Sequence, residues 1–145
     1  MTETFAPSPT RTDTAAARRA AFLPCLILLA GFLVVSVAME ALLLTLGTTG
    51  TAVDIAIWIR CTLVLGSALI LLLFAISAFR GSRPAWVRIR IISPIVVVAV
   101  VVIVSIPGFL PDWVRVEQAI CGALVLPVAI LANRPLMRAV FPKGV

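Results

Sequence analysis

The hydrophobic positions of this chain fall into four long runs, and short segments between the runs hold most of the polar and charged residues. The runs cover residues 20–46, 55–79, 91–110 and 113–133. A helix needs about 20 apolar residues to cross roughly 30 Å of hydrocarbon, and each run reaches that length. The fourth run is the least uniform, because polar residues interrupt its first two turns. These residues are Arg115, Glu117 and Gln118.

The runs predict helices and not β-strands. Inside a bilayer every backbone N–H and C=O must be paired within the protein, which leaves helices or closed barrels. A barrel strand alternates between lipid-facing and interior side chains, and the run over residues 91–110 shows no such alternation. The sequence therefore predicts an all-α integral membrane bundle of four transmembrane helices, joined by short loops.

Composition agrees with the membrane interpretation. Hydrophobic residues make up 62% of the 145 residues, and the mean hydropathy is +1.20. A soluble domain of this size leaves much of its surface in water and could not bury so much apolar side chain. We expect a disordered cytoplasmic tail over residues 1–17, the transmembrane domain over 18–135, and a short basic cytoplasmic tail over 136–145. For that last tail, a short interfacial helix and a frayed end are both open.

The connections between the runs carry turn and helix-start signals. A glycine- and threonine-rich turn over 47–51 precedes Asp54, which suits the first turn of the second helix. Pro84 allows the third helix to begin at Ser82 or Arg83, before the apolar run itself, and Pro107 with the following glycine ends that helix. The valine-rich sequence of the third run predicts a helix that faces lipid on most of its surface.

The basic residues are distributed unevenly along the chain. Ten of the twelve lie in the two tails and the middle connection, whereas Arg60 and Arg115 lie on the other side. The positive-inside rule then predicts that both termini and the middle connection are cytoplasmic, in the plasma (cell inner) membrane. The basic segments also predict attraction to anionic headgroups at the cytoplasmic face. We expect no binding of nucleic acid, because no soluble domain remains to present a basic surface.

Several residues beside the third and fourth runs have the chemistry of interfacial anchors. Tryptophan prefers the layer between lipid and water, and arginine extends its charged end toward the headgroups. The predicted anchors are Arg80, Arg83, Trp86, Arg88, Arg90 and Trp113.

The sequence predicts neither an enzyme nor a protein with a metal or other cofactor. It has no histidine, so Ser/His and Cys/His nucleophile pairs are excluded, as are imidazole metal ligands. Cys25, Cys61 and Cys121 are dispersed through the runs and suit packing as small hydrophobic residues. Cys61 and Cys121 fall at similar depths, so a disulfide between them is the alternative.

A set of charged and polar residues inside the runs is the candidate functional site. Glu40 lies about six residues before the end of the first run, and Arg60 about six residues into the second, so both fall roughly 9 Å below the same boundary. An unpaired charge in a bilayer costs up to about 3 kcal/mol, and we therefore expect Glu40 and Arg60 to pair, with Glu117 or Gln118 as further partners of Arg60. The predicted intramembrane polar cluster is Glu40, Arg60, Arg115, Glu117 and Gln118.

Two functions fit this cluster. If it is a clamp that fixes helix register, the chain is a small multi-pass, non-catalytic accessory or structural component of the plasma membrane. Its partner is then a larger membrane protein or a second copy of the chain. If the cluster is a polar vestibule in which Glu40 binds a proton or a cation, the chain is a small oligomeric transporter or channel.

Overall fold

The structure, a computed structural model, describes residues 11–141 and is all-helical over that range. Four of its five helices are long and apolar enough to cross a membrane, which confirms the predicted helical class. The helices are α1 (Arg11–Thr48), α2 (Ile55–Phe79), α3 (Arg83–Ser105), α4 (Asp112–Asn133) and α5 (Pro135–Val140).

The observed helix bounds depart most from the apolar runs at the start of α1, at the two ends of α3 and in the C-terminal tail. α1 begins at Arg11, so the expectation of disorder is wrong for residues 11–17, where three consecutive alanines favour helix. Residues 1–10 of that predicted tail lie outside the described residues. α3 begins at Arg83 and ends at Ser105, because Pro84 occupies its first turn and Pro107 follows its end. The tail after the fourth run begins with α5, which confirms a short helix there. The buried side chains of Met137 and Phe141 face the bundle, so the predicted placement of the apolar side in the headgroup boundary is wrong for these two residues.

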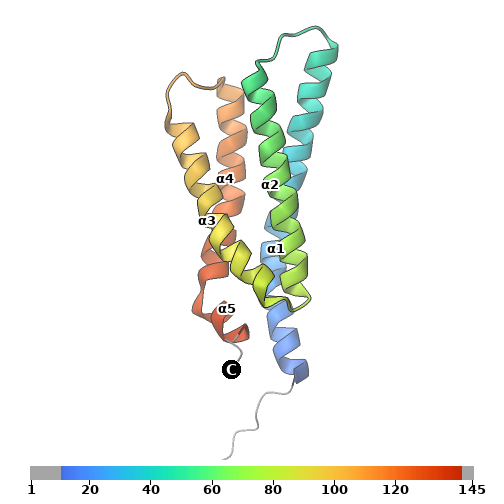
Figure 1. The fold of residues 1–145 in the computed structure, drawn as a ribbon, viewed down its shortest axis with the longest axis vertical. Helices are drawn as coiled ribbons and strands as arrows, with labels where there is room; N and C mark the ends of the chain where they lie inside the picture. Colours follow the sequence, from blue (N-terminus) through green and yellow to red (C-terminus); the bar gives the residue numbers. More distant parts are fainter. Residues whose placement is uncertain (1–10, 142–145) are drawn as a thin grey trace, which may run out of the picture.

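The four long helices form an antiparallel bundle in which each helix packs against two neighbours (Figure 1). The order around the bundle is α1, α2, α3, α4, with α4 back against α1, and α5 folds under the bundle against α1 and α4. Within the described residues no Cα atoms of the diagonal pairs α1/α3 and α2/α4 lie within 8 Å of each other. In Figure 1, α3 lies against α2 near their short connection and diverges from it toward the other end of the bundle.

The buried residues of α1 and α4 follow a heptad pattern that explains this packing. In α1 and α4 they recur alternately three and four residues apart, which is the spacing of helices that pack nearly antiparallel with a left-handed twist. In α1 these residues are Phe22, Cys25, Leu29, Phe32, Ser36, Met39 and Leu43. In α4 the series is Val114, Gln118, Cys121, Val125, Val128 and Ala132, and Glu117 and Ala129 are buried beside it.

Two glycines end helices in the bundle. Gly50 after α1 and Gly81 after α2 have positive φ angles of 78° and 109°, which side chains other than glycine rarely adopt. At each, the amide of the next residue bonds to the carbonyl five residues earlier, Thr51 to Leu46 and Ser82 to Ser77. This is the Schellman ending, and it turns the chain sharply into the next helix.

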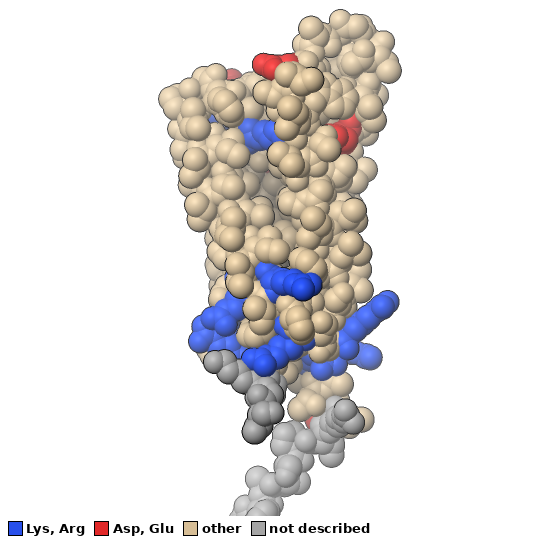
Figure 2. Space-filling view, in the orientation of Figure 1, with Lys and Arg blue, Asp and Glu red and all other residues tan. Residues whose placement is uncertain are grey.

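Basic residues form a band around the lower end of the molecule, here called the basic end, whereas acidic side chains are visible near the upper end (Figure 2). The opposite end, with the α1–α2 and α3–α4 connections, is here called the far end. Both ends of the described chain lie at the basic end (Figure 1). Between the two ends the visible surface is almost entirely uncharged, as the composition predicts (Figure 2).

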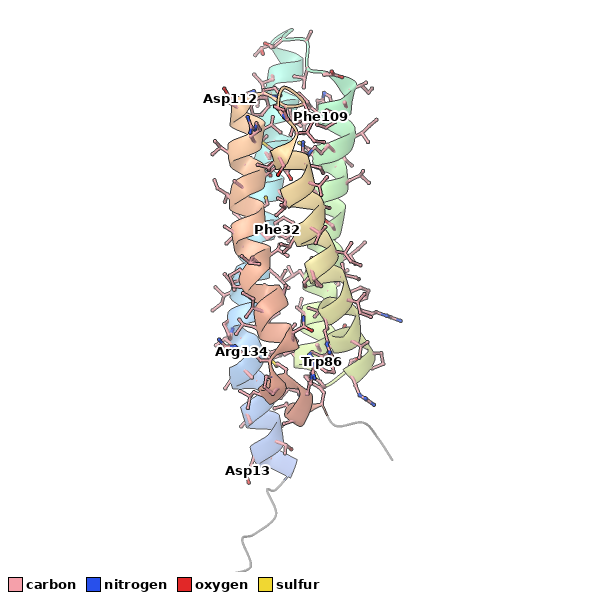
Figure 3. All side chains as sticks on the ribbon, turned by 90° about the vertical axis from the view of Figure 1, so that its left-hand side faces the viewer. Asp13, Phe32, Trp86, Phe109, Asp112 and Arg134 are labelled. Carbon is pink, nitrogen blue, oxygen red and sulfur yellow. The ribbon has the colours of Figure 1, made fainter. Side chains whose placement is uncertain are left out.

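Trp86 is not an interfacial anchor. Its side chain is 3% exposed, its ring stacks on Phe141 with ring centroids 5.3 Å apart, and its Nε1 donates a hydrogen bond to the carbonyl of Ala132. Phe22 completes the contact by packing edge-on against Phe141. The prediction is wrong because α5 folds back beneath the bundle and covers the indole, which the sequence pattern of α3 alone does not indicate. Figure 3 shows Trp86 near the end of α5.

α3 exposes more of its surface than the other long helices, as the sequence predicts. The smallest buried share among the four candidate spans belongs to α3. Its exposed side chains include Ile91, Ile95, Val98 and Val101. We conclude that the valine-rich segment mainly supplies outer surface and contributes little to the core.

Candidate functional site

The predicted polar residues of α1, α2 and α4 lie in the half of the bundle toward the far end. Arg60 and Glu117 are each 9% exposed and Gln118 is 1% exposed, so these three side chains are inside the protein. Burial of ionic groups is costly unless they are paired or hydrogen-bonded. The partners of each group therefore decide what the cluster does.

Glu117 is held by neighbours on its own helix. Its Oε2 accepts a hydrogen bond from Gln118 Nε2 at 2.6 Å, and its Oε1 accepts one from the Cys121 thiol at 3.1 Å. Cys121, interpreted from the sequence as a small hydrophobic residue, thus has a further role as a hydrogen-bond donor. The signal was present, because Cys121 follows Glu117 by four residues, the spacing at which helical side chains meet.

The predicted pairing of Glu40 with Arg60 is wrong. Glu40 Oε1 accepts a hydrogen bond from the Thr62 hydroxyl at 2.8 Å, and within the described residues the ion pair found joins Arg115 to Asp112. The reason lies in the helical turn of about 100° per residue. Cys61 faces the core of the bundle, so Thr62 and Arg60 lie on opposite flanks of α2, and the Thr62 flank is the one beside α1.

Arg60 carries the least satisfied polar group in the cluster. Its Nε, Nη1 and Nη2 atoms are all buried, and none has a hydrogen-bond partner in the described part of the chain. Glu117 lies within electrostatic range, yet no ion pair within 4 Å joins the two. A guanidinium has five N–H donors, and leaving buried donors without partners costs free energy.

An apolar groove opens beside Arg60, on the flank of α2 that faces α3. The groove has a volume of about 780 Å³ and is lined by α2, the end of α3 and the α3–α4 connection. We call it the α2–α3 groove, and its walls include Ile59, Leu63, Ile103, Ile106 and Phe109, with Asp54 and Arg60 as its charged residues. Phe109 lies in the connection at the far end (Figure 3).

The groove is confined to the far end of the bundle. Along α2 its lining runs from Asp54, the residue before the helix, to Leu63, a distance of about 14 Å, whereas the 25 residues of α2 span about 37 Å. It forms because α3 diverges from α2 in this half of the molecule. The groove is therefore a lateral recess, and its lining does not continue toward the basic end.

Arg115 lies apart from the buried cluster. Its side chain is partly exposed, its Nη1 lies 3.9 Å from the Asp112 carboxylate, and its Nη2 donates a hydrogen bond to the Val104 carbonyl at 3.2 Å. Arg115 thus ties the start of α4 to the end of α3. It contributes to helix packing and does not line the α2–α3 groove.

The remaining predicted anchors lie on or near the surface. Arg80 and Arg88 are exposed, Arg83 is partly buried, and Trp113 is 41% exposed. The Arg88 guanidinium lies over the Phe74 ring at 5.3 Å. That these four residues contact lipid headgroups stays a prediction.

Arg90 is the remaining predicted anchor. It donates a hydrogen bond to Asn133 and lies over the buried Trp86 ring, so it has a packing role.

The three cysteines are buried and form no disulfide, so the alternative of a Cys61–Cys121 disulfide is not realised. Within residues 11–141, no three side chains of the types His, Cys, Asp and Glu are grouped so that they could hold a metal ion.

No protein-family model matches this chain, and comparisons with curated proteins and with solved structures give no match either. The class of the protein therefore follows from its own fold. Four apolar helices of sufficient length are compatible with a small membrane protein.

Proposed function

We propose that this chain is a non-catalytic accessory protein of the plasma membrane that binds a membrane lipid in the α2–α3 groove. In this proposal the four long helices span the bilayer, with both termini and the α2–α3 connection in the cytoplasm. The far end then lies in the outer leaflet. The observation that carries the proposal is the buried, unpartnered guanidinium of Arg60 in the wall of an open apolar groove.

The surface of the bundle supports insertion into a bilayer. Large apolar side chains are exposed on all four long helices, among them Ile27, Leu63, Ile95 and Val116. Contiguous apolar surface of this extent is rare on soluble monomers. The ten-to-two distribution of basic residues supports the orientation through the positive-inside rule.

The polar cluster supports a non-catalytic role. The Cys121 thiol, which lies beside the Glu117 carboxylate, is the candidate nucleophile of the cluster. It is 1% exposed, so a substrate would not reach it. Glu117 is engaged by Gln118 and Cys121. A general base must come within hydrogen-bond distance of a substrate proton, and neither group offers that access.

Site-specific photo-crosslinking tests the lipid-binding proposal. A photoreactive phenylalanine analogue replaces Leu63, which lines the groove, and in a matched variant it replaces Leu73, which is exposed on the same helix outside the groove. We expect an adduct of defined lipid mass at position 63 and a diffuse mixture at position 73. Equal patterns at the two positions, or a protein adduct at position 63, would contradict the proposal.

Transport is a second candidate function, favoured by one observation. Glu40 Oε2 is buried and has no hydrogen-bond partner in the described part of the chain, which leaves an oxygen to hold a proton or a cation. The competing interpretation is a clamp, in which Glu40 and Thr62 fix the register of α1 against α2.

The variant Glu40→Gln separates transport from the clamp. If Glu40 is a transport site, the variant accumulates normally in the membrane but loses ion or proton uptake in liposomes that contain the purified protein. If Glu40 is a clamp, the variant mainly lowers the yield of folded protein. Absence of uptake by the unmodified protein under proton and cation gradients would reject the transport function.

A further inference from the structure

We propose that the α2–α3 groove selects a phospholipid whose headgroup ends in an ammonium, with the phosphate at Arg60 and the ammonium at Asp54. This inference rests on the proposed lipid-binding function and names the class of lipid. Three features of the groove support this inference: the unpartnered guanidinium of Arg60, the carboxylate of Asp54 nearer the far end, and the apolar walls.

The guanidinium of Arg60 fits a phosphate. It is nine-tenths buried, and all three of its nitrogens lack partners among the described residues. Guanidinium binds phosphate through two parallel hydrogen bonds, and such charge-assisted bonds are about twice as strong as neutral ones. A phosphate would supply the acceptors that the protein does not.

The depth of Arg60 fits the headgroup layer. Arg60 follows Ile55, the first residue of α2, by five residues, which places its backbone about 7.5 Å below the start of that helix. The long arginine side chain can reach back toward the boundary. Leu63 and Ile103 continue the groove below, and they offer apolar surface to an acyl chain.

Asp54 makes the site selective among phospholipids. It lines the same groove six residues before Arg60, about 9 Å nearer the water. One of its carboxylate oxygens caps α2 by accepting from the Ala56 amide, and the other is available to a ligand. An ethanolamine headgroup carries its ammonium two carbons beyond the phosphate ester, at the polar end of the lipid. A phosphate at Arg60 would therefore leave the ammonium free to turn toward Asp54.

A headgroup with only negative charge matches this pair less well. Such a lipid would gain the bonds between its phosphate and Arg60, but it would lack a positive group for Asp54 and would be repelled by that carboxylate.

The size of the α2–α3 groove suits a ligand of this kind. Its volume of about 780 Å³ lies within the range of roughly 300–1,000 Å³ typical of small-molecule sites.

The competing explanation is that Arg60 serves only to neutralise Glu117. Glu117 is within electrostatic range of Arg60, although its two oxygens accept from Gln118 and Cys121. Under that explanation, a variant that lacks both charges would recover both the stability and the lipid selection that removal of Arg60 alone disturbs. The lipid proposal expects the double variant to recover stability without recovering lipid selection.

The test measures which lipid the full chain retains. The protein is purified from nanodiscs that hold equal amounts of dioleoyl phosphatidylethanolamine and dioleoyl phosphatidylglycerol, and bound lipid is identified by native mass spectrometry. We expect the unmodified chain to retain phosphatidylethanolamine over phosphatidylglycerol by about threefold or more. We expect Arg60→Gln, alone or with Glu117→Gln, to lose that preference.

Asp54→Asn isolates the selectivity step without threatening the fold, because asparagine caps helices as well as aspartate does. We expect this variant to retain lipid with a ratio near one. The matched controls are Arg115→Gln and Asp112→Asn, since both residues lie at the far end but outside the groove lining. Both controls should keep the preference of the unmodified chain.

Three results would overturn the inference: equal retention of the two lipids by the unmodified chain, a preference unchanged in Arg60→Gln, or a preference restored by adding Glu117→Gln. If Arg60→Gln does not fold, the ratio for Asp54→Asn still decides. A lipid adduct at Leu63 without headgroup preference would leave the proposed lipid-binding function standing and reject this inference alone.

Discussion

Two tryptophans with similar sequence surroundings have different roles in this molecule. Trp86 and Trp113 each lie in the first turn of a helix, two residues after a proline. Trp113 is exposed, whereas Trp86 is buried, stacks on Phe141 and donates a hydrogen bond to the end of α4. A buried indole contributes large contact area, and its N–H needs a partner, which the Ala132 carbonyl supplies.

We predict that Trp86→Ala lowers the free energy of unfolding by about 3–5 kcal/mol, the usual range for a tryptophan removed from a core. The matched control Trp113→Ala should lower it by less than about 1 kcal/mol. Trp86→Phe should fall between the two, since it keeps an aromatic ring but loses the hydrogen bond. Denaturation of the purified protein in mixed detergent micelles measures all three. Equal effects at positions 86 and 113 would refute the packing role of Trp86.

Residue depth in the bundle was predictable from the sequence, but residue direction was not. Counting along the runs placed Glu40 and Arg60 at one depth, and both do lie in the half of the bundle toward the far end. Their partners depend on helix rotation, which is set by the packing of all four helices. Thr62 was overlooked because a lone threonine in an apolar run gives no signal until its flank of α2 is known to face α1.

At the scale of the element, the helices themselves were readable because length and hydropathy are local properties. α2 matches its predicted range, and the proline and glycine signals locate the turns after α2 and α3. The start of α1 and the position of α5 were less accessible. α5 is short, and its place beneath the bundle depends on contacts such as that of Phe141 with Trp86, which join residues far apart in the sequence.

The spacing between α3 and α4 gives a prediction at this scale. A Cβ added at Gly122 would lie 3.0 Å from Val100 Cγ1, whereas one added at Gly66 in α2 would meet nothing within 4 Å. Valine is stiff at χ1, so it cannot easily turn away. We expect Gly122→Ala to destabilise the protein by about 1–3 kcal/mol through overpacking, and Gly66→Ala to stabilise it by up to about 1 kcal/mol through helix propensity.

The same unfolding measurement checks this pair. Because both variants make an identical chemical change inside a helix, the difference between them isolates the α3–α4 contact. A stabilising effect of Gly122→Ala would show that α3 can move away from α4 without loss, and it would contradict the close approach of these two helices.

At the scale of the whole molecule, the division into a basic end and a far end was visible in the sequence, and the fold brings it together. The basic residues of three separate segments form one band (Figure 2), because an antiparallel bundle places every second connection on the same side. The α2–α3 groove was not predictable in this way. It arises from the divergence of α3 from α2, a property of packing that no single run encodes.

Orientation in the membrane is the prediction that belongs to this scale. Thr49, in the α1–α2 connection, and Ala139, in α5, are both exposed, and they lie at opposite ends of the bundle. Cysteine introduced at position 49 should react with a membrane-impermeant maleimide in intact cells, and cysteine at position 139 should react only after the membrane is opened. The unmodified chain is the control, since its three cysteines are buried. The positive-inside rule favours this orientation, since ten basic residues stand against two. Labelling of position 139 from outside would show the opposite orientation. The α2–α3 groove and the lipid proposed to bind there would then lie in the cytoplasmic leaflet.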